Sequence, residues 1–411
     1  MSSGNLVSVI LVPETVYGIK DEPLSGVTAE TARFTSESLS GTPTTTTSAA
    51  IRTDRMSGGQ YVTGLEVGGA LDYELSAGDY FDMMFEAAMM SDWIAAADLS
   101  TDVTLTPDPT DDQQATLVIT GDLSAIGDGV AVNDVLQLIP AAGSPISLSV
   151  ISVESTTSCT VATKRGELAI GGDSMTVSIP AHLVIGADQK SFTVGKSYLD
   201  VTHDVTSDIH SQTYTGELVG GFTIDATYGS LTTGAFALMG NGYALDAPSY
   251  EQQIVTAGGT INPAGTEAPL NASIDVPVVT ANGLATTFCI ESFNIAFQNN
   301  LDPSNCIGKA APTSYTLGTA ELNVTSSIYL SDTSYDLWME NKLTQTPVSL
   351  TFEMVNASGG YSFHLAQVQL SFPDPSSDGQ DTQTMIEGSG TGKVGANGES
   401  AIVIYRMVGD Q

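Results

Sequence analysis

The chain has 411 residues, and 41% of them are hydrophobic, which is enough to bury a core in two or three domains. Lys and Arg number 12 against 47 Asp and Glu, which gives a formal net charge of −35. Because no basic run could neutralise phosphates, the composition excludes tight nucleic-acid binding as the main activity. An acidic surface repels DNA, although an acidic proteome from a marine or halotolerant source would explain the same balance.

The sequence also indicates the cellular compartment in which the protein is made. Three cysteines, Cys159, Cys289 and Cys306, cannot all pair within one chain. Cys289 and Cys306 could form a disulfide, but we expect free thiols in a reducing cytoplasm. Residues 1–13 lack the basic region and the length of a signal peptide, and no apolar run reaches the length of a membrane span. We therefore expect a protein made in the cytoplasm, with no membrane insertion.

In chain order, the first predicted elements are strands. Residues 6–12 form a short apolar run, and residues 33–39 are predicted to form a strand before a Thr- and Ser-rich loop. Residues 61–75 alternate apolar and other residues around three glycines, which predicts a strand pair or a bent strand. Abundant Gly, Ser and Thr with few aromatic residues are typical of an all-β protein with many turns.

A helix is predicted next, over residues 79–90. Tyr80, Met83, Met84, Ala87 and Ala88 recur at helical spacing, and this apolar stripe is expected to pack against a sheet rather than bind a partner. Ser76 is the predicted N-cap of this helix.

The second half of the chain repeats the first. Phe34-Thr-Ser-Glu37-Ser38 is echoed by Phe288-Cys-Ile-Glu291-Ser292, and each copy is followed by Leu-Ser and then a tyrosine, at Tyr80 and Tyr335. The separation from Phe to Tyr is 46 residues in the first copy and 47 in the second. The second copy is predicted to contain strands over 288–297 and 320–330, a helix over 334–343 and a strand from residue 348. Such spacing indicates one fold duplicated within the chain.

Comparison of the copies locates an insertion. From Tyr80 to the strand at 190–194 is 112 residues, whereas from Tyr335 to Leu350 is 15. The excess predicts an inserted β domain over 91–188, a small barrel or sandwich, because long insertions are tolerated on loops. The predicted domains are therefore 1–90 with 189–245 (first copy), 91–188 (insert), 246–283 (linker or arm) and 284–411 (second copy). Residues 373–398 are predicted to be a polar loop or hairpin before a last strand over 401–407.

The chain offers little catalytic chemistry. His203 and His210 lack further ligands at zinc spacing, and the glycine-rich segment 388–393 departs from the phosphate-binding loop because Lys393 precedes Val394. Residues 374–381 resemble half of a calcium loop without its closing Glu. The sequence therefore predicts no catalytic, cofactor or metal site, and building material rather than an enzyme.

Motifs along the chain resemble a known family. The motifs are Glu14-Thr-Val-Tyr-Gly18, Arg33 to Leu39, Ile51-Arg-Thr-Asp-Arg55, Val67-Gly-Gly69, Glu74 to Tyr80, Phe85-Glu-Ala-Ala88, Trp93, Lys190-Ser-Phe-Thr193, Phe236-Ala-Leu-Met-Gly240 and Ile404-Tyr-Arg406. Their order resembles that of the major tail tube proteins of long-tailed, non-contractile (siphovirus-type) bacteriophages. Met56-Ser57-Gly58 departs from the more polar continuation of the family.

The resemblance implies a structural virion protein whose fold is two packed antiparallel sheets flanked by a helix, present twice in this chain. Subunits would join edge to edge into rings that stack as a hollow tube, through which double-stranded DNA passes during ejection. The implied partners are further copies of the chain, the tape measure protein, the tail terminator and distal tail or baseplate proteins. The implied location is the virion tail, after synthesis in the host bacterial cytoplasm.

The predicted duplication affects the number of chains expected in each ring. Tail tubes are typically sixfold, so three two-copy chains would complete a ring, and a homotrimer with pseudo-sixfold symmetry is preferred over a homohexamer. The alternative function is a virion-surface adhesion or carbohydrate-binding protein whose insert, expected on the tube exterior, carries the binding. A secreted enzyme or adhesin is disfavoured because the chain has neither a signal peptide nor a recognisable active site.

Overall fold

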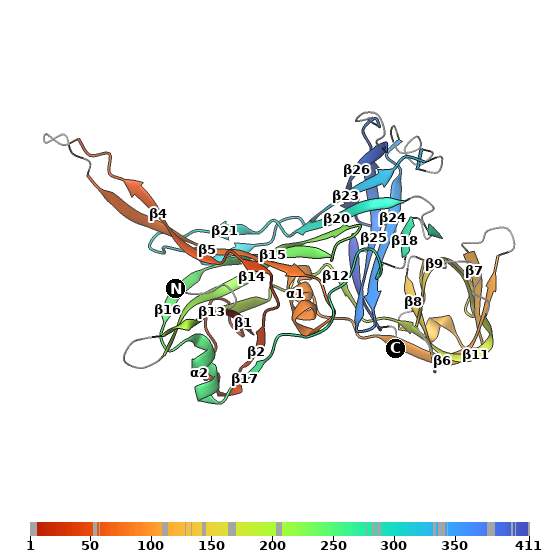
Figure 1. Cartoon of the computed structure of the whole chain (residues 1–411), viewed down its shortest axis with the longest axis horizontal. Helices are drawn as coiled ribbons and strands as arrows, with labels where there is room; N and C mark the ends of the chain where they lie inside the picture. Colours follow the sequence, from red (N-terminus) through yellow and green to blue (C-terminus); the bar gives the residue numbers. More distant parts are fainter. Residues whose placement is uncertain are drawn as a thin grey trace.

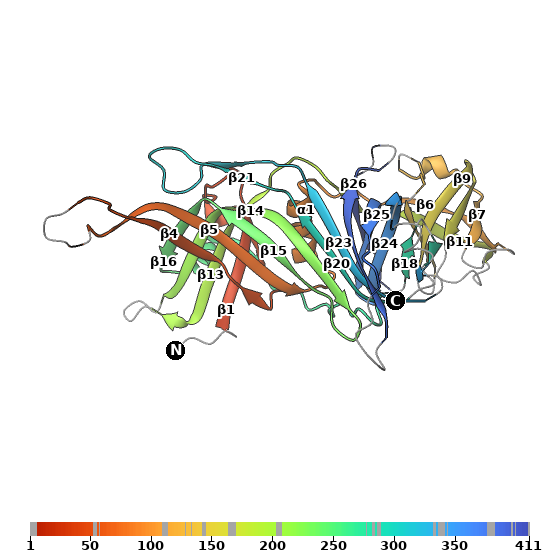
Figure 2. The same ribbon diagram turned by 90° about the horizontal axis from the view of Figure 1, so that it is seen from above.

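The computed structural model describes residues 6–51, 56, 58–108, 114–127, 129–132, 134–141, 145–162, 170–202, 208–276, 278–281, 284–285, 289–331, 334–335, 342, 344–375, 383–395, 398 and 400–409. The described chain is mostly β, which confirms the predicted all-β class with short helices. The molecule is elongated: a two-stranded arm projects at one end, a small barrel lies at the other, and sheets fill the space between them (Figures 1 and 2).

The first unit contains α1 (Asp79–Met89) and a set of antiparallel strands. Its strands are β1 (Val7–Pro13), β2 (Thr28–Thr31), β3 (Ser36–Glu37), β4 (Ser40–Thr47), β5 (Gln60–Glu74), β12 (His182–Val184), β13 (Ser191–Thr202), β14 (Ile209–Thr227), β15 (Thr233–Gly240) and β16 (Gly242–Asp246). Short 3-10 turns occur at Leu24–Gly26 and, in the barrel, at Leu123–Ala125. The predicted strand over 61–75 is one bent strand, because β5 runs unbroken for 15 residues.

The second unit follows a connecting segment. The connection holds α2 (Tyr250–Ala257) and β17 (Thr260–Asn262). The strands of the second unit are β18 (Val278–Ala281), β19 (Leu284–Ala285), β20 (Ile290–Gln298), β21 (Asp302–Ser304), β22 (Ser314–Thr316), β23 (Glu321–Tyr329), β24 (Pro347–Asn356), β25 (Gly359–Ser371), β26 (Met385–Lys393) and β27 (Ile402–Met407). Residues 334–335, 342 and 344 are helical, in the region where a helix is predicted. Phe288 of the repeated motif lies outside the described residues.

Strand pairing is repeated between the two units. In the first, neighbours run in the order β1, β13, β14, β15, β5, β4, and β16 pairs with the N-terminal half of β14. In the second, they run β18, β24, β25, β26, β23, β20, and β27 pairs with the N-terminal half of β25. The same path through two sheets is therefore built twice, as expected for an internal repeat.

The six-stranded barrel lies between α1 and β12 in sequence. It consists of β6 (Ala97–Pro107), β7 (Gln114–Ile119), β8 (Val135–Pro140), β9 (Ile146–Ser155), β10 (Ser158–Ala162) and β11 (Ile170–Ile179), which close in the order β10, β7, β6, β11, β8, β9. Its core continues into the second unit, because Val403, Tyr405 and Met407 of β27 pack in the same cluster. Gln137 adds two hydrogen bonds to the backbone of Val408. The barrel is therefore packed against β27 at the far end of the molecule from the arm (Figure 2).

The apolar stripe of α1 packs as predicted. Tyr80, Met84, Ala87 and Ala88 are at most 5% exposed and lie in the core that the two units share, and Met83 is partly buried against it. Burying a large apolar side chain such as Met contributes about 1.5–3 kcal/mol, so the stripe alone fixes the helix on the sheets. The predicted N-cap is wrong. Gly78 occupies the N-cap without a side-chain hydrogen bond, whereas Ser76 is buried two residues earlier in a backbone bridge to Pro269.

Two further elements differ from the prediction. Residues 246–283, predicted to be a linker, contain α2, in which Ser249 and Gln252 form a capping box and Tyr250 and Ile254 pack on β1. This helix spans eight residues, too few for a sustained periodic stripe. Residues 373–398, predicted to be a loop or hairpin, contain β26 in the middle of a sheet.

Candidate functional site

One antiparallel sheet runs without interruption through both units. Its central joint is the pairing of β14 with β20, seven residue pairs from Gly221↔Gln298 to Thr227↔Ser292. The sheet therefore orders eight strands as β4, β5, β15, β14, β20, β23, β26, β25. We call this the wall sheet; it runs across the middle of the molecule in Figure 2.

The wall sheet has one apolar face and one polar face. On β14, Phe222, Ile224 and Ala226 are buried, whereas the intervening Asp225 and Thr227 are exposed. The other strands alternate in the same way, since successive side chains of a strand point to opposite faces. The polar face carries Asp72, Glu74, Thr223, Asp225, Asn294, Ala296, Asn323, Thr325, Ser389, Thr391, Gln369 and Ser371.

Pairing aligns these polar residues in rows across the sheet. One row runs through Glu74, Thr233, Asp225, Asn294, Thr325, Ser389 and Ser371, each paired with the next. Within it the Asn294 amide donates a hydrogen bond to the Asp225 carboxylate. Most side chains of the row are short, so this face is shallow and hydrophilic.

The charge on the wall sheet is one-sided. Its eight strands contain eight carboxylates, whereas Lys393 is their only Lys or Arg. One carboxylate, Glu217, is buried, and the others are Glu66, Asp72, Glu74, Asp225, Glu291, Glu321 and Glu387. A surface of this sign repels a phosphate backbone and offers almost no basic group to hold it.

Both edges of the wall sheet are open in the part of the chain that the structure describes. At one edge, β3 and β4 pair with β5 alone. At the other, β24 covers β25 only as far as the Pro347↔Gln369 pair, and no described strand pairs with Leu370 or Ser371 on that side. Unpaired edges of this kind are templates for another strand.

The repeated Phe-x-x-Glu-Ser motif lies at an open edge of the wall sheet in the first copy and at the β14–β20 joint in the second. Glu37, on β3, forms an ion pair with Lys196 of β13 at 2.6 Å and accepts the backbone N–H of Leu39. Burial opposes the charge of Lys196, but its hydrogen bond and ion pair with Glu37 outweigh burial and raise the pKa of this lysine. In the second copy Glu291 accepts the backbone N–H of Tyr228 through its own carbonyl, at the β14–β20 joint.

A hairpin of the second unit crosses back over the first. Residues 299–320, which include β21 and β22, extend along β5 and β15 in Figure 1. The Asn299 amide donates to the carbonyls of Ala88 and Val219, and the Tyr315 hydroxyl donates to the Gly240 carbonyl at 2.9 Å. Tyr315 and Leu301 pack with Met90 and Leu218 of the first unit, so the hairpin strengthens the joint between the units.

A carboxyl group is buried near this contact. Glu217 is 0% exposed, and neither of its side-chain oxygens has a hydrogen-bond partner among the described residues. Burial, together with the nearby Glu14 carboxylate, raises the pKa of Glu217 to about 8. Glu14 itself accepts hydrogen bonds from the Gly18 and Gly216 backbones and from the Ser191 and Thr193 hydroxyls.

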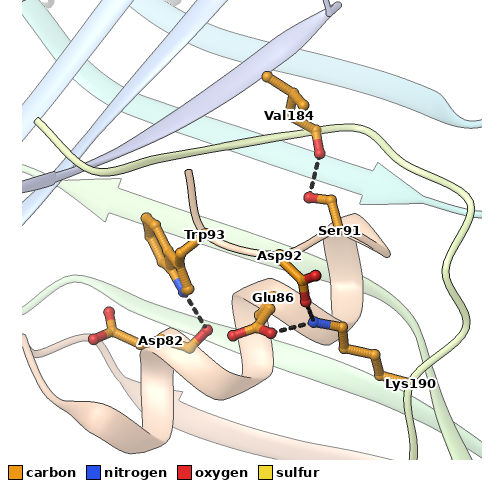
Figure 3. A network of polar contacts seen from close by, with 7 residues as sticks. All are labelled: Asp82, Glu86, Ser91, Asp92, Trp93, Val184 and Lys190. Carbon is orange, nitrogen blue, oxygen red and sulfur yellow. Dashed lines mark hydrogen bonds and ion pairs between the residues drawn. The ribbon is translucent and has the colours of Figure 1, made fainter. Parts of the chain in front are cut away.

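Polar contacts fix α1 and the residues that follow it against β12, Lys190 and the second unit (Figure 3). Lys190 forms ion pairs with Glu86 and Asp92, the Ser91 hydroxyl donates to the Val184 carbonyl, and the Trp93 indole donates to the Asp82 carbonyl. The Asp82 carboxylate accepts from the Tyr361 hydroxyl at 2.8 Å and pairs with Arg406 at 2.7 Å. Burial raises the pKa of Asp82 despite Arg406 and Tyr361. Two side chains of the second unit thus bind the helix of the first.

Other candidate chemistry stays scattered. In the described residues no cluster of three or more His, Cys, Asp or Glu is placed to hold a metal, and all three cysteines are free. His203 and residues 376–381 of the calcium-like segment lie outside the described residues. The glycine-rich segment 388–393 is part of β26. No helix among the described residues has the length and apolar character to cross a membrane.

The sequence analysis missed β26 for a physical reason. Gly388, Gly390 and Gly392 face the core, where a Cβ atom would meet Phe372, Val368 and Leu322 at 2.6 Å or less. Neighbouring side chains therefore fill the space above this strand, and the apolar alternation that marks other strands is absent. The alternation of Gly with Glu387, Ser389 and Thr391 was the available signal.

Comparison with known proteins agrees with this geometry. A family model described as phage tail tube protein matches residues 4–392, nearly the whole chain. No curated protein matches the chain. The family match confirms the resemblance drawn from the sequence motifs. The chain belongs to the phage tail tube protein family.

Proposed function

We propose that this chain is the structural subunit of a siphovirus-type tail tube, in which three copies close a ring with pseudo-sixfold symmetry and rings stack around a DNA channel. The β14–β20 joint carries this proposal. Within one chain, two tail-tube units already join edge to edge into one wall sheet through seven residue pairs. A joint between chains can be built in the same way.

Ring closure uses the two open edges. One edge of β14 pairs with β13 over its first part and with β20 over the part that follows. On β25, β24 covers the first part, and Leu370 and Ser371 begin the part that β20 occupies in β14. The β3–β4 edge of a neighbouring chain corresponds to β20 and would pair there. Three chains with eight wall strands each give a closed sheet of 24 strands and leave no open edge.

The polar face of the wall sheet would line the channel. Its carboxylates are almost unopposed by basic groups, and most of its other side chains are short. A lining of this kind keeps the phosphate backbone from adhering, since each basic contact would add drag to moving DNA. The protein would conduct DNA without binding it and would need no catalytic group.

The other partners follow from the tube. The tape measure protein would occupy the channel before ejection, and the tail terminator and distal tail or baseplate proteins would contact the end rings. The barrel packs on β27, in the second layer of the second unit, which favours a place on the exterior. The protein would be made in the host cytoplasm and function in the virion tail.

Electron microscopy of the purified protein tests the proposal. Hollow rings or tubes with threefold order and six wall units per ring are expected. Strict sixfold order of the whole ring would refute the three-chain arrangement. Monomers that bind glycans through the barrel, with no ring under any condition, would favour the adhesion alternative.

A further inference from the structure

The arm of the first unit and the 299–320 hairpin of the second are corresponding parts of the repeat. Each connects the first wall strand of its unit to the second: β4 to β5 in one case, β20 to β23 in the other. Their return strands share a motif, Tyr61-Val-Thr-Gly64 and Tyr315-Thr-Leu-Gly318, followed by Glu66-Val67 and Glu321-Leu322. Tyr61 therefore corresponds to Tyr315.

The two tyrosines differ sharply in environment. Tyr315 is 9% exposed, and its hydroxyl donates to the Gly240 carbonyl across the joint between the units. Tyr61 is 60% exposed, and its hydroxyl donates to Gly58 within the arm itself. Val62, beside it, is 66% exposed. An apolar pair held out on a two-stranded arm gains no burial energy until another surface covers it.

The surface that receives Tyr315 also has a counterpart. In the first unit Met90 ends α1 in a left-handed conformation (φ 53°), and Leu218 pairs with Met239 just before Gly240. In the second unit Gln345 has the same left-handed conformation (φ 48°), and Gln369 pairs with Thr391 just before Gly392.

Only the first of these surfaces is covered within the described chain. Met90 and Leu218 are buried under the hairpin, at 2% and 0% exposed. Gln345, Gln369 and Thr391 are exposed. The chain thus displays one uncovered anchor and one uncovered receiving surface, and the arm points away from the second unit of its own chain (Figure 1).

We propose that the arm docks on the second unit of the neighbouring chain as the 299–320 hairpin docks on the first, with Tyr61 seated over Gln345 and Gln369 and its hydroxyl donating to the Gly392 carbonyl. This inference rests on the proposed ring, because only a ring places a second unit next to each arm. The docking makes each joint between chains resemble the joint within a chain. Tyr61 is then an assembly anchor that plays no part in folding of the single chain.

Substitution of Tyr61 tests the anchor. Tyr61→Ala is expected to leave the unfolding midpoint of the single chain unchanged and to abolish rings and tubes in micrographs. Tyr228→Ala, at a tyrosine that is 76% exposed in the turn after β14, is the matched control and should assemble as the unmodified chain does. Tyr315→Ala should instead lower the unfolding midpoint. Tubes formed by Tyr61→Ala in normal yield would overturn the docking and leave the proposed tube intact.

Cross-linking tests the receiving surface. With Cys289 and Cys306 replaced by Ser, Tyr61→Cys combined with Gln369→Cys should give disulfide-linked multimers only in assembled tubes, reversed by reductant. Tyr61→Cys with Tyr228→Cys is the control pair, for which no linkage is expected. Assembled tubes without a disulfide between positions 61 and 369 would refute this docking site, whereas failure of the unmodified chain to form any ring would refute the proposed function instead.

Discussion

Replacement of Glu217 by Gln should remove a large pH dependence of stability at the joint between the two units. The folded chain holds this carboxyl group at a pKa of about 8, because burial and the Glu14 carboxylate oppose its ionisation. In the unfolded chain the pKa is near 4.5. Between these two values the folded state binds one more proton than the unfolded state, so the free energy of unfolding falls as pH rises.

The size of the effect follows from the shift. Each unit of pKa corresponds to about 1.36 kcal/mol, so a shift of about 3.5 units removes ~5 kcal/mol between pH 4.5 and pH 8. Gln has nearly the same shape and cannot ionise, although a buried amide without partners costs ~1–3 kcal/mol. At pH 5 we therefore expect the free energy of unfolding of Glu217→Gln to be equal to that of the unmodified chain or slightly lower. At pH 8 we expect it to be higher by several kcal/mol.

Urea unfolding of the single chain at pH 5, 6, 7 and 8, followed by circular dichroism, measures this difference. Titrating groups that do not interact with Glu217 cancel when the variant is compared with the unmodified chain at each pH. Glu14→Gln is a second variant: its carboxylate accepts four hydrogen bonds, two of them from backbone N–H groups, so its loss should lower the free energy of unfolding. Because this change also removes a charge that opposes ionisation of Glu217, it should weaken the fall of stability with rising pH. Parallel pH profiles for Glu217→Gln and the unmodified chain would show that Glu217 is solvated or ionised in the folded protein.

Two further predictions concern the wall sheet. Gly390→Val should lower the free energy of unfolding by ~1–3 kcal/mol, because a Cβ there meets a Val368 methyl at 2.6 Å. The control Thr391→Val, on the exposed face, should change the free energy of unfolding by less than ~0.5 kcal/mol. Equal effects of the two changes in a urea titration would contradict the assigned faces. Thr325→Lys with Ser389→Lys, two paired residues of the polar face, should slow DNA ejection from phage that carry the variant tube several-fold at low salt, with recovery at high salt. The same positions changed to Glu should eject DNA at the normal rate, and an unchanged rate for the Lys pair would place this face away from the channel.

Local sequence patterns were enough to establish the fold class and the helix α1 and to predict the duplication. The stripe from Tyr80 to Ala88 needs only the period of a helix, and the Phe-x-x-Glu-Ser motif needs only its recurrence at matched distances. Family membership followed from the order of such motifs. Ser76 shows the limit of this reasoning, since it is buried in a backbone bridge to Pro269 rather than capping the helix.

The way in which the two copies join is visible only in the folded chain. The β14–β20 pairing links residues about 70 positions apart, and no local pattern encodes which edge meets which. The glycines of β26 are explained only by side chains that reach over them from β23, β25 and Phe372. The buried Glu217 and the docked Tyr315 likewise depend on contacts between the N-terminal segment, β14 and the second-unit hairpin. Contacts of this range are set by packing of completed sheets, which a single sequence does not display.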